Sequence, residues 1–465
     1  MTLTAPSTQP WLKRLPTLLY WGFFVLGLGW MLYIWSQSTG TPADDELTHV
    51  LVARSDWHYP FLILDIWMRV ANSLIFMIPS LLGLNGVRLS AVIMTVLTLL
   101  LTTLIGKRMG IKWLFLIPLL FWFQPWVSDL GYTGIKSIPF MFLLTLGIYL
   151  WLSDHPLWAA FLVGTLPLSR HEGIALTGVW FLYMLYRRKW GAAVMCWLPV
   201  ALYNIVYWLQ FHASFQDLPI AIYFRPQSSG YYGSGPWYHF FPPVVVGVGI
   251  PVLIWSVFGL PSLRPLRGKA IWMVLPVTYF VVHTVIYLFG LYESGGYGMF
   301  LIPIAPGFAI LASLGVENVI RWLPAVPALK KVVPVATAIA LMLAVIPPIY
   351  ATTLTTTPRL MNEAEHTAQE AVNWMKNYGA PDEIIYATYP WFNLLYGLIL
   401  TPDKKYITNQ IMEDKPIGTI FLWDLKYSDV NGVTREFLAQ RGWKEITRFN
   451  GETIIVYKRE ALTGS

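Results

Sequence analysis

Long apolar segments recur through the first 350 or so residues of the chain and are separated by short polar connections. A helix needs about 20 apolar residues to cross the hydrocarbon core of a bilayer, and most of these segments approach that length. The pattern predicts a polytopic helical membrane domain over residues 1–352, with about eleven transmembrane helices. The predicted spans are 17–36, 86–106, 111–127, 135–152, 156–169, 173–187, 191–211, 243–260, 270–290, 297–320 and 332–351.

The pattern changes after Arg359 from long apolar runs to the shorter periods of a water-soluble domain. An amphipathic stretch at 361–378 predicts a helix, and alternation of apolar and polar residues indicates strands. We therefore expect a small α/β domain over residues 353–465. Its other predicted elements are strands at 383–388, 404–408, 417–423, 443–448 and 452–458, a helix at 431–441, and a hairpin turn at Asn450-Gly451.

Basic residues lie in clusters between alternate apolar segments, as at Lys13/Arg14 and Arg187/Arg188/Lys189. Because Lys and Arg are enriched in cytoplasmic loops, this alternation predicts a cytoplasmic N-terminus and an extracytoplasmic C-terminal domain. The first external loop is then 37–85. Its apolar part at 61–82 carries Asp65, Arg69 and Asn72, so we interpret it as an interfacial helix and not as a span.

The composition agrees with a membrane protein, with 56% hydrophobic and only 12% charged residues. The formal charge of +7 is dispersed in the loop clusters, which indicates topology and argues against a nucleic-acid partner. The single cysteine, Cys196, excludes an intrachain disulfide and a cysteine-rich metal site. We expect a multi-pass protein of the plasma (inner) membrane.

Three adjacent carboxylates, Asp44, Asp45 and Glu46, follow the first apolar segment directly, and His49 comes three residues later. Pro42 and Asp44 indicate a helix start. In such a helix Asp45 and His49 share one face, whereas Glu46 points about 100° away. The carboxylates either complement the positive end of the helix or carry chemistry at the membrane surface, and the sequence leaves both alternatives open.

The stretch Asp45-Glu46-x-x-His49 after the first span resembles the signature of the GT-C superfamily of membrane glycosyltransferases, especially protein O-mannosyltransferase-like and aminoarabinose-transferase-like enzymes. Further segments extend the resemblance in order over roughly residues 15–320. These segments are Asp56-Trp57-His58-Tyr59-Pro60-Phe61, Leu82-Gly83-Leu84-Asn85-Gly86-Val87-Arg88-Leu89, Ser169-Arg170-His171-Glu172-Gly173, and Tyr297 followed by Pro303 and Pro306.

The resemblance implies an inverting enzyme that transfers a hexose or pentose from a polyprenyl-phosphate sugar to a glycan, lipid or protein acceptor. It matches Asp45 to the catalytic base, with Asp44 and Glu46 as neighbouring candidates. Donor phosphate or sugar binding would then fall to Arg170, His171, Glu172, His58, Tyr59, Arg225 and Tyr297. Gly295 and Gly296 precede Tyr297 where relatives often carry a basic residue, which leaves one phosphate ligand without a match.

Several alternatives stay open at this level. Arg170 either binds a phosphate or pairs with Glu172, because a charge beside a short apolar span needs a partner. Arg88 is an interfacial anchor or a local ion-pair partner. Asp45, His49 and His171 could hold a divalent metal, although their spacing is not diagnostic and no cofactor is firmly implied. A transporter or flippase of lipid-linked sugars would also need many spans, but we find no internal repeat of the kind that transporters carry.

Overall fold

The computed structural model describes residues 10–224, 233–269, 271–326, 332–405, 407–451 and 453–461. The chain forms two compact units. The first comprises residues 1–36, 91–132 and 136–357, and the second comprises 37–90, 133–135 and 358–465. The second unit therefore combines the first loop with the C-terminal region, whereas the sequence grouped that loop with the membrane domain.

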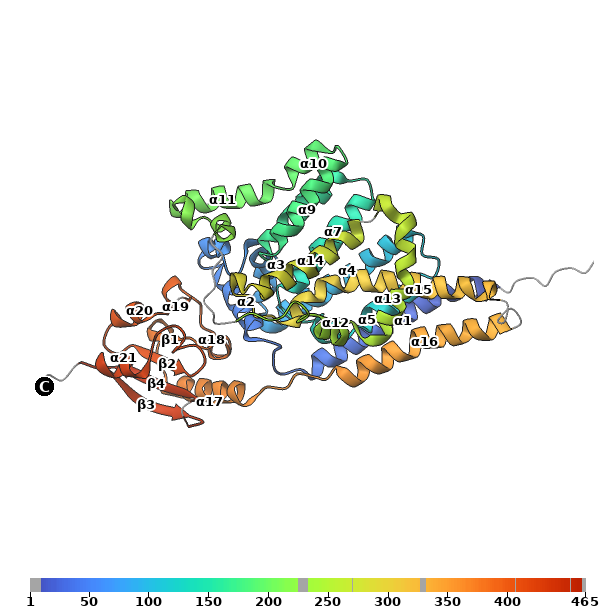
Figure 1. Cartoon of the computed structure of the whole chain (residues 1–465). Helices are drawn as coiled ribbons and strands as arrows, with labels where there is room; N and C mark the ends of the chain where they lie inside the picture. Colours follow the sequence, from blue (N-terminus) through green and yellow to red (C-terminus); the bar gives the residue numbers. More distant parts are fainter. Residues whose placement is uncertain are drawn as a thin grey trace, which may run out of the picture. The chain divides into compact units, whose positions relative to one another are not determined.

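Helices make up the first unit (Figure 1). They are α1 (Pro10–Gln37), α4 (Gly83–Met109), α5 (Leu116–Trp122), α6 (Pro125–Leu130), α7 (Ser137–Leu152), α8 (Pro156–Thr165), α9 (Gly173–Tyr186), α10 (Trp190–Met195), α11 (Leu198–Phe211), α12 (Phe241–Val248), α13 (Ile250–Gly259), α14 (Ile271–Leu288), α15 (Ala305–Trp322) and α16 (Val333–Thr355). α1 ends and α4 begins in residues assigned to the second unit.

Within the described residues, six helices are long and apolar enough to cross a membrane, or seven if one bent pair counts as a span. The bent pair is α12 and α13, which meet at 100°. Gly249 lies at this bend with a φ of 86°, in the left-handed region that glycine adopts without strain. A polytopic helical fold is thus confirmed, but the predicted count of eleven is not, because several apolar helices have only 10–17 residues. α9 is one of these short helices, as the sequence indicated.

The second unit begins with the first loop, which holds α2 (Asp44–Ser55), a 3₁₀ turn at Pro60–Leu64 and α3 (Val70–Ser80). The continuous helix expected over 61–82 is interrupted at Asp65. Its side chain accepts a hydrogen bond from the Met68 N–H at 2.5 Å and forms an ion pair with Lys405 at 2.5 Å. α3 is therefore only 11 residues long.

The C-terminal region folds around a four-stranded sheet in the order β1-β2-β4-β3. β1 (Ile385–Ala387) and β2 (Ile420–Asp424) are parallel, whereas β4 (Ile454–Arg459) is antiparallel to both β2 and β3 (Trp443–Phe449). The hairpin at Asn450-Gly451 is confirmed, and both residues have positive φ. The helices are α17 (Glu363–Tyr378), α18 (Pro390–Tyr396), α19 (Pro402–Lys405), α20 (Asn409–Glu413) and α21 (Arg435–Gln440).

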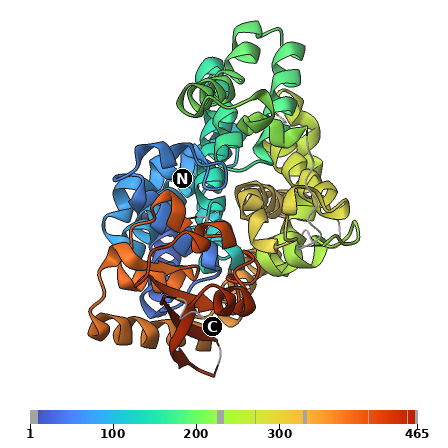
Figure 2. The same ribbon diagram turned by 90° about the vertical axis from the view of Figure 1, so that its left-hand side faces the viewer.

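Alternate side chains of β4 enter two different apolar clusters. Ile454 and Val456 pack with α17 and α18, and Ile455 and Tyr457 pack with Leu438 of α21. This is the period of two expected of a strand covered on both faces. Leu47 of α2 belongs to the first cluster, so the first loop contributes to the core of the α/β region. Figures 1 and 2 show these blue and orange-red segments side by side within the second unit.

The strand predicted at 404–408 is wrong, because residues 402–405 form helix α19. Pro402 occupies the first helical position, where its missing N–H costs nothing. The N–H groups of Lys404 and Lys405 donate to the Thr401 carbonyl at 3.0 and 2.9 Å, which closes the turn. Local turn chemistry therefore overrides the apolar alternation of this segment.

Candidate functional site

The three adjacent carboxylates of the first loop occupy the first turn of α2, as the sequence predicted for the helix start. Ala43 precedes them in an extended conformation and donates no side-chain cap, so the helix begins without a capping hydrogen bond. Negative charge at this end complements the helix dipole. The three side chains nevertheless have different environments, and those environments separate their roles.

Glu46 is fully buried and forms a bidentate ion pair with Arg88 of α4. The Arg88 Nε and Nη2 atoms donate to its two oxygens at 3.1 and 3.0 Å. The Gly134 N–H donates a further bond to Oε1 at 2.7 Å. Because a Cβ at position 134 would lie 2.6 Å from the Val87 side chain, only glycine allows this approach. Both oxygens of Glu46 are thus engaged, and Arg88 is a local ion-pair partner.

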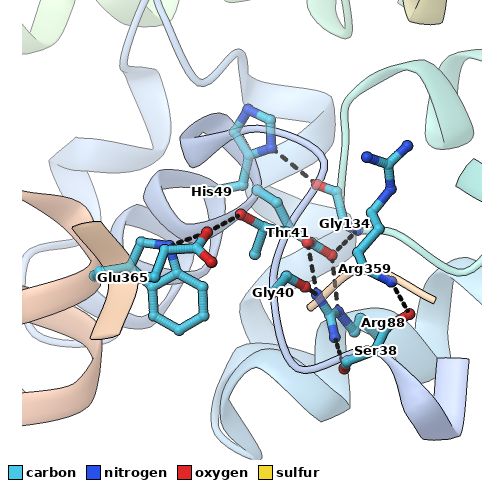
Figure 3. Close-up of polar contacts among 10 residues, drawn as sticks. Ser38, Gly40, Thr41, His49, Arg88, Gly134, Arg359 and Glu365 are labelled. Atoms are coloured by element: carbon cyan, nitrogen blue, oxygen red, sulfur yellow. Dashed lines mark hydrogen bonds and ion pairs between the residues drawn. The ribbon is translucent and has the colours of Figure 1, made fainter. Parts of the chain in front are cut away.

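Arg88 also anchors the start of the loop, as Figure 3 shows. Its Nη2 donates to the Gly40 carbonyl at 2.7 Å and its Nη1 to the Ser38 carbonyl at 3.3 Å. The Gly40 N–H in turn donates to the Arg359 carbonyl at 2.8 Å, and the Arg359 N–H donates to Ser38 Oγ at 3.0 Å. The loop entry is thereby held against the chain that leads into α17.

Glu365 of α17 adds to the contacts that hold the entry of the first loop (Figure 3). It forms a capping box with Asn362 and accepts a hydrogen bond from Trp391 Nε1 at 2.8 Å. Thr41 donates to the same oxygen at 3.5 Å. Burial raises the pKa of Glu365, although the donated hydrogen bonds oppose that effect. These contacts fix residues 38–41, which directly precede the carboxylates.

Asp44 bonds to the α/β region through one oxygen, Oδ2. Lys426 Nζ and the Tyr427 hydroxyl both donate to it at 2.5 Å. Burial, followed by the charge of Asp44, raises the pKa of Tyr427, so its hydroxyl keeps the proton that it donates. Asp44 therefore fixes the start of α2 to the loop after β2.

Asp45 differs from both neighbours. Its side chain is half-buried, and it makes no hydrogen bond or ion pair with any residue that the structure describes. Its charge acts on Tyr427, whose pKa it helps to raise. A rigidly held helix turn thus presents one carboxylate whose oxygens are not consumed by the fold.

His49 is buried one turn after Asp45. Its Nδ1 lies 2.8 Å from the Gly134 carbonyl oxygen (Figure 3). Its ring centre is 5.2 Å from that of Trp67. Within the described part of the chain, no group of three or more His, Cys, Asp or Glu side chains is placed to hold a metal ion. The suggested set of Asp45, His49 and His171 therefore gains no support.

The segment after α2 contains the predicted residues His58 and Tyr59. His58 is exposed, whereas Tyr59 is half-buried and packs its ring 6.2 Å from that of Phe61. The neighbouring Asp56 is fully buried, and burial raises its pKa to about 7 despite the Ser73 hydroxyl and the charge of Lys405. Nothing in the sequence marked Asp56 as the perturbed carboxyl of this stretch.

The first unit holds a separate buried cluster at Ser169–Gly173. Arg170 pairs with Glu172 through Nε at 3.2 Å and Nη2 at 2.9 Å, and its Nη1 donates to Ser137 Oγ at 3.2 Å. The ion pair left open by the sequence is thus present. Arg170 is 7% exposed and its guanidinium lies 4.2 Å from the centre of the Phe300 ring.

Two histidines flank Glu172 in this cluster. The Nε2 atoms of His171 and His283 each lie 3.5 Å from Glu172 Oε1. His283 is fully buried, whereas the side chain of His171 is 22% exposed. Sequence reasoning missed His283, although an ionisable residue inside an apolar helix is itself a signal of function or of a buried partner.

Tyr297 lies at the entry to the 3₁₀ segment Gly298–Ile304 and is 49% exposed. Its ring centre is 5.7 Å from that of Phe300, on which Arg170 rests. The structure thus places Tyr297 next to Phe300, the ring that the Arg170 guanidinium contacts. Arg225 lies outside the described residues.

Comparisons with known proteins identify the fold. ArnT from Cupriavidus metallidurans in the apo state matches with a TM-score of 0.62 and 12% identity, over 94% of this chain and 97% of that chain. ArnT from the same organism bound to undecaprenyl phosphate matches with a TM-score of 0.59 and 12% identity, over 97% and 98% of the respective chains. No protein-family model and no curated protein sequence matches. The chain thus has a fold similar to that of ArnT.

Proposed function

We propose that this chain, on the fold it shares with ArnT, is a membrane glycosyltransferase that uses a polyprenyl-phosphate sugar. One of the similar structures is bound to undecaprenyl phosphate, which supports a polyprenyl lipid as the donor class. The hexose or pentose is moved to an acceptor hydroxyl at the extracytoplasmic membrane face. The second unit, with the first loop and the α/β region, is extracytoplasmic in this proposal, in line with the distribution of basic loops.

The observation that carries the proposal is the state of Asp45. A general base needs oxygens that can reach a substrate proton, and Asp45 is the carboxylate of this turn that the fold leaves unbonded among the described residues. Asp44 and Glu46 hold the turn in place on either side. Preorganisation of this kind lets the base act without reorienting its own helix.

The proposed reaction is a single displacement. Asp45 takes the proton of the acceptor hydroxyl as its oxygen forms a bond to the anomeric carbon of the sugar. The bond between that carbon and the phosphate oxygen breaks, and the electron pair leaves with the polyprenyl phosphate. Because attack and departure occur on opposite sides, the anomeric configuration is inverted.

The departing phosphate needs positive charge or hydrogen-bond donors. We assign this role to the cluster in the first unit, where Arg170 is held by Glu172 and His171 is the most exposed member. Tyr297 and, on the first loop, His58 and Tyr59 are further candidates for contact with the donor. The fork of Arg170 is already shared with Glu172, so His171 is the first of these residues to test.

The test is transfer by the purified full-length chain in detergent with a panel of radiolabelled polyprenyl-phosphate sugars. We expect label to move to an acceptor with inversion, and Asp45→Asn to lower kcat by about 10²–10⁴-fold. Because Asp45 makes no hydrogen bond or ion pair in the described structure, this variant should lose at most the contribution of one charge to the helix dipole, less than about 1 kcal/mol. Retained anomeric configuration, or turnover that survives in Asp45→Asn, would contradict the mechanism. In proteoliposomes, labelled donor that crosses the bilayer without transfer of its sugar would indicate a flippase instead.

A further inference from the structure

A cavity of about 150 Å³ lies inside the second unit, between α2 and the α/β region. α2 contributes Thr48 and Leu51, and the α/β region contributes residues of β1, α18, α19 and the loop after β2. At about 30 Å³ for each molecule in the liquid, this volume corresponds to roughly five waters. It suits one small polar ring and not a long chain.

The wall of the cavity contains a buried acceptor without a partner. Asn393 of α18 is 4% exposed and donates through Nδ2 to the Ala387 carbonyl at 2.9 Å. Its Oδ1 atom is buried and has no hydrogen-bond partner. Leaving a buried carbonyl unsatisfied is costly, so a ligand that donates a hydrogen bond there is favoured. A hydroxyl can do this, whereas a phosphate dianion or a carboxylate cannot.

Donors and apolar surface complete the wall. Lys404 is 8% exposed and gives one hydrogen bond, to the Asp382 carbonyl at 2.6 Å, which leaves further N–H groups on its three-proton ammonium. The charge of Lys405 is balanced by Asp65 at 2.5 Å. Leu51 and Leu400 supply apolar surface. A sugar ring complements this wall, because its hydroxyls can bond to the polar groups and its C–H faces can pack against the leucines.

The cavity is connected to the carboxylate turn through two residues. Tyr427 lines the cavity and donates its hydroxyl to Asp44 at 2.5 Å. Thr48 also lines the cavity, and its Oγ1 donates to the Asp44 carbonyl at 3.1 Å. A ligand in the cavity therefore lies along the helix whose first turn carries Asp45.

The geometry points to a monosaccharide-binding site in this cavity, lined by Asn393, Lys404, Thr48 and Tyr427, that receives the terminal sugar of a glycan acceptor. The role as acceptor rests on the proposed function, but the binding of a hydroxyl-rich ring does not. Asn393 accepts a ligand hydroxyl and Lys404 donates to a ligand oxygen. The acceptor is thereby narrowed from glycan, lipid or protein to a glycan.

Binding is measured by calorimetry on the full-length protein in detergent, without any donor lipid. The probes are methyl α-D-mannopyranoside and methyl α-D-glucopyranoside, with sodium phosphate as the ionic comparison. Asn431→Trp fills the cavity from an exposed position at its rim. The matched control is Asn377→Trp, an exposed asparagine of α17 that does not line the cavity.

We expect saturable binding of at least one glycoside to the wild type, to Asn377→Trp and to Asp45→Asn. Affinity in Asn431→Trp should fall at least about ten-fold, with a Tm equal to that of the control. The site is refuted if neither glycoside binds, if Asn431→Trp binds as well as the wild type, or if phosphate binds and the glycosides do not. Binding without transfer by any donor refutes the acceptor role and the proposed function, and leaves the saccharide site standing.

Discussion

Glu46 and Arg88 form a two-point ion pair in which neither side chain is more than 2% exposed. The pair joins the first turn of α2 to α4, and through Arg88 it also holds the carbonyls of Ser38 and Gly40. An ion pair removed from water stabilises a fold only when both partners are present, because each desolvated charge is costly alone. The first prediction follows from this dependence.

Arg88→Met should lower the free energy of unfolding by about 3–5 kcal/mol, because Glu46 is left as an unpaired buried charge. The measurement is the Tm of the purified protein in detergent. The double variant Glu46→Gln/Arg88→Met should recover part of the loss. Arg441→Met is the matched control, since Arg441 pairs with Glu413 at 2.8 Å but both are nearly half exposed, and it should cost less than about 1 kcal/mol. Equal losses of stability in Arg88→Met and Arg441→Met would contradict the conclusion that the Glu46–Arg88 pair is buried and mutually dependent.

The two donors to Asp44 should contribute unequally to stability. Tyr427→Phe removes a largely buried hydrogen bond to a carboxylate and should cost about 1.5–3 kcal/mol. Lys426→Met removes a contact from a side chain that is 63% exposed and should cost less than about 1 kcal/mol. Thermal unfolding of both variants tests this order. A greater loss of stability in Lys426→Met would show that Lys426, and not Tyr427, is the main partner of Asp44.

The buried carboxyl of Asp56 should make stability depend on pH. Its pKa is raised from 3.8 to about 7 in the folded chain, so the folded state holds the proton more tightly than the unfolded state. Stability is therefore greatest below the unfolded pKa and falls as the pH rises towards 7. At 1.36 kcal/mol for each pH unit, the difference amounts to at most about 4 kcal/mol.

Asp56→Asn mimics the protonated carboxyl and removes this dependence. Its Tm should exceed that of the wild type at pH 5, and by a larger margin at pH 8. The control is Asp429→Asn, an exposed aspartate whose replacement should leave the pH profile unchanged. A wild-type profile that is flat between pH 5 and 8, or parallel to that of Asp56→Asn, would exclude Asp56 as the titrating group.

Arg170→Lys should be destabilising even though it keeps the charge. A lysine cannot reproduce the fork that meets both oxygens of Glu172, and it loses the planar contact with Phe300. We expect a loss of about 2–4 kcal/mol, read as a lowered Tm in detergent. Arg187→Lys, at the exposed arginine that follows α9, should stay within about 0.5 kcal/mol. A Tm like that of the wild type would show that the fork is dispensable.

The sequence predicted features that depend on local chemistry. The start of α2 followed from Pro42 and Asp44, and the hairpin between β3 and β4 followed from Asn450-Gly451. An ordered series of short motifs pointed to the fold that the chain shares with ArnT. It did not predict the helix at 402–405, where one proline outweighed the alternation, or the exact number of spans, which depends on where short helices bend.

Partners distant in the chain could not be predicted in the same way. The sequence left Arg88 as an interfacial anchor or an ion-pair partner, and only the fold identifies Glu46 as its partner. Nothing near Asp44 indicates Lys426 and Tyr427, because these residues are 382 and 383 positions away. The distinction among the three adjacent carboxylates rests on these distant partners. The sequence could therefore locate the candidate site but could not assign a role to each of its oxygens.

Leu47 belongs to a core whose other members lie beyond residue 360, and this affects how the protein is made. At a synthesis rate of about 5–20 residues per second, the ribosome needs on the order of 20–80 seconds to proceed from the first loop to Val456, the last buried member of this core. During that time the apolar side of α2 has no partner from the C-terminal region. Arg88 and Gly134 can hold Glu46 early, but the contacts of Asp44 with Lys426 and Tyr427 form only after the C-terminal region has been translated.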